Sequence, residues 1–110
     1  MTRQQLLHHI EKLYERGLTI IAAKNADYAA DQDAFKNFRS AEVVGVAPDR
    51  AILVRVMDKL SRVGNLLDKE ADVKDESVDD TILDAINYLA ILHAYLVDGS
   101  WEGGEGENRR

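Results

Sequence analysis

Apolar residues recur with the period of an α-helix in three long stretches of this 110-residue chain, and this periodicity constrains the fold more than any other feature. The stretches cover approximately residues 2–30, 48–70 and 77–98. The sequence therefore predicts an all-α fold of three long helices, with residues 1–98 forming a single helical domain.

Residues that favour helix ends support these boundaries. Thr2 and Gln5 have the spacing of a capping box, in which each side chain binds a backbone N–H group of the other residue. Pro48 suits the first turn of a helix, where its missing N–H group costs nothing. Ser77 with Asp80 can cap the third helix in the same way as Thr2 with Gln5.

The remaining segments lack regular periodicity. Residues 31–47 form a long connection, and Phe35 and Phe38 can hold it to the core as a short helical turn. A connection of this length is often functional. Residues 99–110 are rich in glycine and charged residues, so we expect a flexible C-terminal tail.

The apolar faces of the helices indicate how they pack. The second helix is expected to bury one face: Ile52, Val56, Leu60, Val63 and Leu67. The third helix is apolar nearly all round between residues 82 and 97, so it should be buried on more than one side. Two neighbouring helices cannot cover such a helix fully. We therefore predict a homo-oligomeric helical bundle with the third helix near its centre.

Composition excludes several classes of protein. There is no cysteine, which excludes thiol chemistry, cysteine-ligated zinc and disulfides, and fits a reducing cytoplasm. The N-terminus has no signal-peptide core and the longest apolar stretch is too short to span a bilayer, so we expect a cytoplasmic protein without a membrane partner. The net charge is −6, and without a basic face the chain should not bind nucleic-acid grooves directly.

A polar stripe interrupts the apolar third helix. Asp80, Asp84 and Asn87 share one helix face by their spacing. A carboxylate in apolar surroundings needs a partner, which is either a basic side chain of another helix or a cation. Oxygen ligands without cysteine favour Mg²⁺ or Mn²⁺. The alternative is a solvent-facing stripe near the helix start, where acidic residues also suit the helix dipole.

The second helix carries a complementary stripe of Arg55, Asp58, Arg62 and Asn65, with Lys59 beside it. Asp58 and Arg62 have the spacing of an ordinary helical ion pair, which is the structural interpretation. In the functional interpretation, Lys59 and Arg62 bind phosphate oxygens.

A third polar stripe lies at the end of the first helix. Lys24, Asp27 and Tyr28 lie there, and Asn37 follows in the connection. The basic and aromatic side chains could hold a phosphate together with a base or sugar, or the stripe could be a frayed polar helix end. Convergence of all three stripes on one cleft is a hypothesis.

Five short segments, in order, resemble one family. They are KNADY (24–28), FKNF (35–38), MDKLSR (57–62), DES (75–77) and DTILDAINYL (80–89). Together they resemble the nucleotide modification associated domain family, small helical proteins common in phages and some bacteria. The resemblance covers about two-thirds of the chain and implies a role in nucleotide metabolism without naming a reaction.

A more distant resemblance is to the all-α NTP pyrophosphatases of the MazG and dimeric dUTPase type. Asp80, Asp84 and the apolar run after them are similar to the last metal motif of those enzymes, which bind Mg²⁺ and cleave a nucleoside triphosphate between its α and β phosphates. Their earlier helix carries paired glutamates, whereas this chain has one acid, Asp58, followed by Lys59 and Arg62. That departure argues against a two-metal site and is compatible with a bound phosphate.

These patterns predict a nucleotide-binding protein, whose catalytic version would be a magnesium-dependent pyrophosphohydrolase. The candidate catalytic residues are Asp80 and Asp84, and the candidate metal ligands are Asp80, Asp84, Asp58 and Glu76. The candidate substrate-binding residues are Lys24, Asp27, Tyr28, Asn37, Lys59, Arg62 and Asn87. One alternative is a non-catalytic module that sequesters a small nucleotide. Another is a helical interaction protein whose stripes are salt bridges, for example between Asp84 and Arg62.

Overall fold

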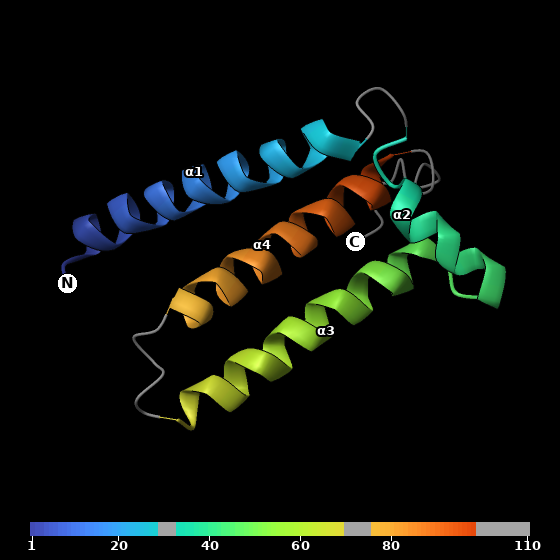
Figure 1. The fold of residues 1–110 in the computed structure, drawn as a ribbon. Helices are drawn as coiled ribbons and strands as arrows, with labels where there is room; N and C mark the ends of the chain where they lie inside the picture. Colours follow the sequence, from blue (N-terminus) through green and yellow to red (C-terminus); the bar gives the residue numbers. More distant parts are fainter. Residues whose placement is uncertain (29–32, 70–75, 99–110) are drawn as a thin grey trace. The chain divides into compact units, whose positions relative to one another are not determined.

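The computed structural model describes residues 1–28, 33–69 and 76–98, and the regular structure in these ranges is helical (Figure 1). In chain order the elements are α1 (Arg3–Tyr28), α2 (Lys36–Arg39), the 3₁₀ helix η1 (Ser40–Val44), α3 (Pro48–Leu67) and α4 (Glu76–Val97). The predicted all-α fold of three long helices and a short helical turn is confirmed.

The chain divides into two compact units, residues 1–34 and 35–110, and each is described here by itself. Unit 1 contains α1, and unit 2 contains α2, η1, α3 and α4. The expectation of a single domain over 1–98 stays a prediction, and the expected tail at 99–110 lies outside the described residues. No helix in the described ranges combines the length and the apolar character needed to cross a bilayer.

Helix α1 begins with the predicted capping box. The Thr2 backbone N–H donates to Gln5 Oε1 at 2.8 Å, and the Gln5 backbone N–H donates to Thr2 Oγ1 at 3.1 Å. Two backbone N–H groups that have no partner within the helix are thereby satisfied. This confirms the predicted start of the helix.

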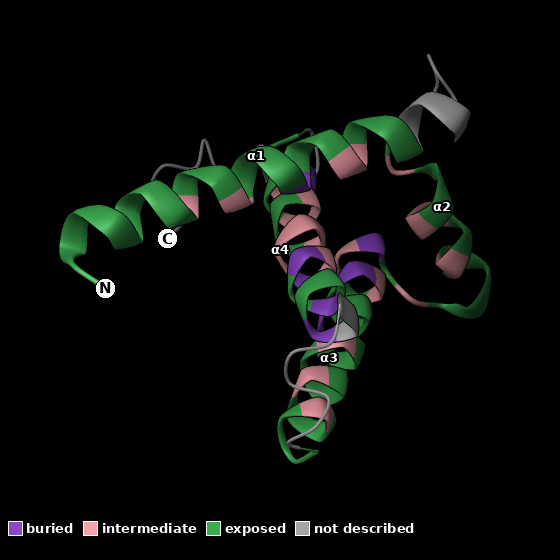
Figure 2. Ribbon diagram, turned by 60° about the vertical axis from the view of Figure 1, so that its left-hand side comes forward, coloured by how far each residue is buried: buried purple, intermediate pink, exposed green. Residues whose placement is uncertain are grey.

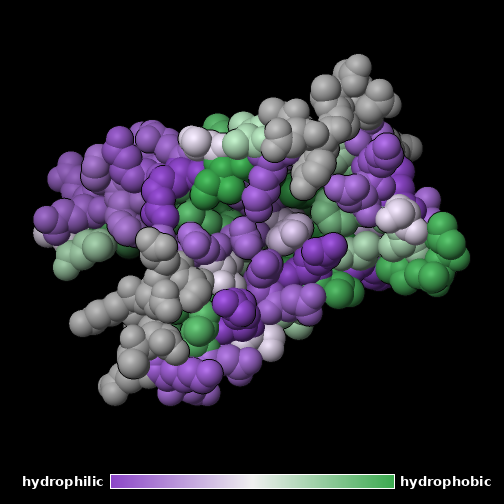
Figure 3. All heavy atoms as spheres, viewed as in Figure 1, coloured by the Kyte–Doolittle hydropathy of each residue, from purple (hydrophilic) through white to green (hydrophobic). Residues whose placement is uncertain are grey.

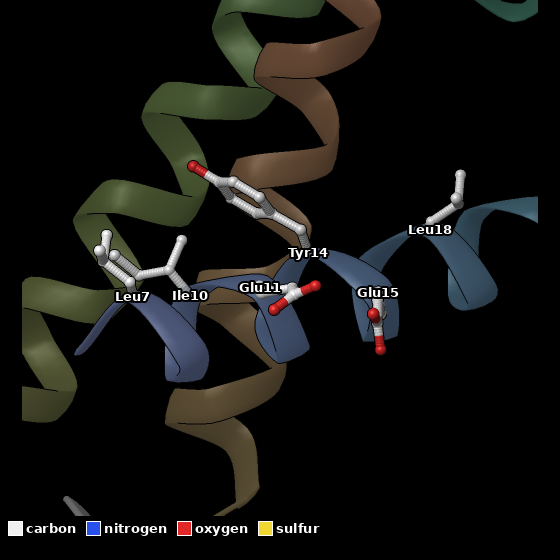
Figure 4. Close-up of a pocket in the computed structure, with 6 residues that line it drawn as sticks. All are labelled: Leu7, Ile10, Glu11, Tyr14, Glu15 and Leu18. Carbon is white, nitrogen blue, oxygen red and sulfur yellow. The ribbon is translucent and has the colours of Figure 1, made fainter. Parts of the chain in front are cut away.

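One side of α1 carries an open depression of about 400 Å³, and its lining comes from this helix alone (Figure 4). The lining residues are Leu7, Ile10, Glu11, Tyr14, Glu15 and Leu18. Tyr14 and Leu18 are more than half exposed. The periodicity of the sequence predicts this helix, but it does not predict that Tyr14 and Leu18 are exposed.

Aromatic contacts hold the segment before α3 against α4, as predicted from the two phenylalanines of that segment. The ring of Phe35 lies edge-on to Tyr95 with 5.2 Å between ring centroids, and Phe38 lies edge-on to Tyr88 at 6.3 Å. Such pairs contribute about 0.5–1.5 kcal/mol each beyond their buried area. Both partners lie on α4, so these contacts attach the short helical segment to the main helix pair of unit 2.

Helix η1 ends at a glycine that the turn requires. Gly45 has φ = +83°, and its backbone N–H donates to the Glu42 carbonyl at 3.0 Å. A residue with a β-carbon is strained in this left-handed conformation. Val43 and Val44 beside it are strongly exposed, and the space-filling view shows the resulting apolar surface over η1 (Figure 3).

Helices α3 and α4 form an antiparallel pair that contains the core of unit 2. Pro48 occupies the first turn of α3, as predicted. Figure 2 shows that buried residues gather where the two helices face each other. Among the residues whose burial is described, the buried apolar residues of this pair are Pro48, Ile52, Val56, Val78, Leu83, Ala85 and Tyr95. Fully burying a valine, leucine or isoleucine side chain stabilises the fold by about 1.5–3 kcal/mol.

Two details of the predicted boundaries are wrong. Helix α4 begins at Glu76, so Ser77 is a helical residue and not the cap before the first turn. Helix α3 ends at Leu67, earlier than the predicted end near residue 70, because Asp68 takes the C-cap position and its N–H donates to the Asn65 carbonyl at 3.3 Å.

The predicted buried face of α3 is also partly wrong. Ile52 and Val56 are buried as expected, but Leu60 and Leu67 are more than half exposed. One residue before Leu60, Lys59 faces α4 and forms an ion pair there. Helical geometry explains the difference, because a face that includes Ile52, Val56 and Lys59 turns Leu60 and Leu67 toward its edge.

Candidate functional site

An ion pair joins α3 to α4 near the middle of both helices. Lys59 Nζ lies 3.0 Å from Asp84 Oδ2, and the two side chains are 28% and 29% exposed. Asp84 therefore has the cationic partner that its apolar surroundings require, and the partner is a basic residue of another helix. This is one of the two alternatives that the sequence left open.

A second polar contact lies one turn farther along α3. Arg62 Nε donates to Thr81 Oγ1 at 3.3 Å, and Thr81 is buried with 4% exposure. The helical ion pair expected between Asp58 and Arg62 is absent from the described residues, and so is the pair suggested between Arg62 and Asp84. The physical reason is that the Arg62 side chain reaches across to α4 and Lys59 takes Asp84.

These two contacts set the register of the polar stripes on α3 and α4. The helices are antiparallel, so residues before Lys59 lie level with residues after Asp84. Three basic residues, Arg55, Lys59 and Arg62, are spaced four and three residues apart, and Asp80, Asp84 and Asn87 have the same spacing. Arg62 therefore lies level with Thr81, next to Asp80, and Arg55 lies level with Tyr88, next to Asn87.

The stripes differ in exposure along their length. Arg55, Arg62 and Asp80 are exposed, whereas Lys59, Asp84 and Asn87 are half-buried. The site therefore has a partly desolvated centre, where Lys59 meets Asp84, between ends that are open to solvent. Two of the three predicted stripes come together in this way.

Sequence reasoning missed two side chains on the α4 face of this site. Thr81 lies three residues before Asp84, and Tyr88 lies four residues after it. Thr81 binds Arg62, and Tyr88 packs against Phe38. Both positions share the Asp84 face of the helix, so their spacing could have identified them.

The other predicted substrate-binding residues lie elsewhere. Lys24 is exposed on α1, and Asn37 is exposed on α2. Asp27 and Tyr28 belong to α1, but their side chains lie outside the described residues. Since α1 belongs to unit 1, convergence of its stripe with the α3–α4 stripes stays a prediction.

The acidic residues in the described ranges do not fit a preformed magnesium cage. No group of three or more metal-binding side chains is present among the described residues. Asp84 is bound to the Lys59 ammonium group, and Asp58 and Asp80 are exposed. The side chain of Glu76, the fourth predicted ligand, lies outside the described residues. A magnesium site built from protein side chains alone needs several oxygen ligands close together, and the described residues do not supply them.

Comparisons of the chain with protein-family models, with curated proteins and with solved structures found no match.

Proposed function

We propose that this protein binds a nucleotide through its phosphate groups at the paired stripes of α3 and α4, and that it does so in the cytoplasm. The observation that supports this proposal most is the set of three basic residues, Arg55, Lys59 and Arg62, along one face of α3. The middle residue of this set already binds a carboxylate oxygen of Asp84. A phosphate oxygen has similar ligand chemistry.

Each side chain of the pair has a distinct role in the proposal. Arg62 uses Nε for Thr81 and makes no other hydrogen bond within the described residues, so its two terminal nitrogens can form a fork around phosphate oxygens. Lys59 adds a compact positive charge, and Asp84 holds that charge in place. The Asn87 amide lies on the Asp84 face, where it can contact a sugar or base.

Nucleotide binding is the main proposal, and hydrolysis of the bound nucleotide is a separate question with its own test. Mg²⁺ commonly reaches such proteins with the phosphates of a nucleotide and takes only one or two protein carboxylates. Asp80 and Asp84 are the residues that would contact such an ion. The resemblance to nucleotide-modifying and pyrophosphatase families supports a search for hydrolysis but names no product.

Binding can be tested by isothermal titration of the purified protein with a panel of nucleoside mono-, di- and triphosphates, with and without Mg²⁺. We expect binding to the wild type and a loss of about tenfold or more in affinity for Arg62→Ala, since a charge-assisted hydrogen bond contributes about 1.5–3 kcal/mol. Lys12→Ala is the matched control, because Lys12 is an exposed base on α1 paired with Glu15 at 3.5 Å. No binding of any nucleotide by the wild type would contradict the proposal.

The same samples answer the question of hydrolysis. Chromatography after incubation with Mg²⁺ would detect a nucleoside monophosphate formed from a triphosphate. If Asp84 is catalytic, Asp84→Asn abolishes product formation but keeps some nucleotide binding. Binding without turnover in the wild type would favour the non-catalytic module.

A second candidate role rests on the same ion pair. Lys59 and Asp84 are each other's close partners, and a contact of this kind is also what a purely structural helix pair contains. In that case the protein is a helical interaction protein, and substitutions at the pair change stability without affecting any ligand.

A further inference from the structure

The hydrogen bond between Arg62 and Thr81 joins an exposed side chain to a buried one. Thr81 is 4% exposed and lies on α4. Arg62 lies on α3 and is exposed, yet its Nε donates to Thr81 Oγ1 at 3.3 Å. The contact therefore ties an arginine at the surface to the buried part of the helix pair.

Thr81 is suited to hold another side chain in one position. Its side chain is branched at the β-carbon, which restricts rotation about χ1, and burial restricts that rotation further. A threonine hydroxyl inside a helix can donate its own proton to a carbonyl of the preceding turn, and a lone pair then remains for a donor from another helix. Thr81 therefore offers Arg62 an acceptor in a fixed place.

The bond at Nε determines how the rest of the Arg62 guanidinium group lies. The group is planar, so a hydrogen bond at Nε restricts the direction of both terminal nitrogens. Arg62 makes no other hydrogen bond within the described residues. Its terminal nitrogens therefore keep a restricted direction and retain their donors for two oxygens of one phosphate group, which is the bidentate geometry that arginine favours.

The other two bases of the α3 stripe lack this combination. Lys59 Nζ lies 3.0 Å from Asp84 Oδ2, so a carboxylate already offsets its charge. Arg55 is exposed, and no hydrogen bond or ion pair restrains its side chain within the described residues. A mobile side chain loses rotamer freedom when it binds a ligand, whereas a restrained one has less freedom to lose. Within the described ranges, Arg62 is thus the base of the stripe that is restrained without being paired to a carboxylate.

We propose that Thr81 is the positioning residue of the nucleotide site, because its hydroxyl holds Arg62 so that the guanidinium fork binds two oxygens of one phosphate group. This inference rests on the proposed nucleotide binding and adds the residue that orients the phosphate contact. It places the main phosphate contact at the Arg62 end of the stripes, beside the half-buried Lys59–Asp84 pair and not on it. Thr81 itself touches no ligand.

The first test measures Arg62 by nuclear magnetic resonance in the free, isotopically labelled full chain. The Nε–H signal of Arg62, assigned by its loss in Arg62→Lys, should exchange with water about fivefold more slowly than that of Arg55, the factor that a net hydrogen bond supplies. Thr81→Val keeps the shape of the side chain and removes the acceptor, so exchange at Arg62 should rise to the Arg55 rate. Thr81→Ser keeps the hydroxyl and should stay slow. An Arg62 signal that does not respond to Thr81→Val would show that Thr81 does not hold this side chain.

The second test measures phosphate binding by isothermal titration. The probe is inorganic tripolyphosphate, which has the phosphate groups of a nucleoside triphosphate without the base or sugar. We expect Thr81→Val to weaken binding about fivefold, Thr81→Ser to bind like the wild type, and Thr81→Val to have no further effect when Arg62 is already alanine. Thr19→Val is the matched control and should bind like the wild type, because the exposed Thr19 hydroxyl binds the Glu15 carbonyl at 3.0 Å within α1.

Arg62→Lys tests the fork without depending on the stability of Thr81→Val. Lysine keeps the positive charge but has a single nitrogen, so it cannot bind Thr81 and also form a fork. We expect Arg62→Lys to bind tripolyphosphate about fivefold more weakly than the wild type. Equal affinities would show that charge alone suffices and that no oriented fork is needed.

The outcomes separate this inference from the proposed function. Binding of tripolyphosphate that Thr81→Val leaves unchanged, or weakens equally when Arg62 is absent, would overturn the role of Thr81 and leave the proposed nucleotide binding intact. A wild type that binds nucleotides but not tripolyphosphate would overturn the phosphate contact at Arg62. A wild type that binds neither would overturn the proposed function, even if the Arg62 signal responds to Thr81→Val as expected.

Discussion

At the residue scale, the centre of the candidate site depends on one lysine, Lys59, which takes the α4-facing position that the apolar pattern assigns to its neighbour Leu60. Lys59 lies between Val56 and Val63 on the α4-facing side of α3. Its aliphatic stem can cover apolar surface while its ammonium group reaches Asp84. The pattern alone favoured Leu60, because a period of 3.6 residues does not decide which of two adjacent positions faces the partner helix.

The Lys59–Asp84 pair can be measured by a double-mutant cycle with Lys59→Met, Asp84→Asn and the double variant, using the free energy of unfolding. We expect a coupling of about 0.5–1 kcal/mol, at the upper end for exposed pairs, because less than a third of either side chain is exposed. The Lys12–Glu15 pair on α1, whose side chains are both 59% exposed, is the control and should couple more weakly. Equal coupling in the two pairs would mean that partial burial adds nothing at the site.

At the scale of single elements, a helix end is easier to predict where a side chain accepts a hydrogen bond from an otherwise unpaired backbone N–H group. The Thr2–Gln5 box depends on local spacing alone, and the structure confirms it. The predicted start of α4 is two residues too late, because a serine followed by an acidic residue three positions later is also compatible with a first helical turn. Local sequence patterns therefore predict the presence of a helix start more reliably than the residue at which the helix begins.

Thr2→Ala should loosen the first turn of α1, because it removes the acceptor of the Gln5 N–H group. Loss of such a cap costs about 0.5–2 kcal/mol of helix stability. Amide hydrogen exchange at residues 3–6 should accelerate by a corresponding factor. Thr19→Ala is the matched control, because the Thr19 hydroxyl binds the Glu15 carbonyl at 3.0 Å within the helix and caps nothing. Unchanged exchange in Thr2→Ala would show that the box does not hold the first turn.

At the scale of the whole molecule, buried side chains are distributed unevenly between the two units. Among residues whose burial is described, Gly17 is the one buried residue of α1, whereas α3 and α4 contain a set of buried apolar side chains. Local stability follows the density of buried contacts. The α3–α4 pair should therefore be the most stable part of the chain.

Native-state hydrogen exchange should show this difference directly. We expect amides in the middle of α3 and α4, near Val56 and Leu83, to exchange only through global unfolding. Amides in the middle of α1 should exchange through openings of lower free energy, because few of its side chains are buried. Equal protection of the three helices would mean that α1 folds and unfolds together with the other two.

The sequence by itself determined the helices, the short turn with Phe35 and Phe38, and the need of Asp84 for a partner. Each of these follows from local periodicity or from the cost of burying a single charge. Only the tertiary structure decided that Lys59 is that partner, that Arg62 binds Thr81 and that Leu60 is exposed. The physical reason is that these contacts depend on the rotation and register of α3 against α4. That register is set by packing along the whole interface, and neither helix encodes it alone.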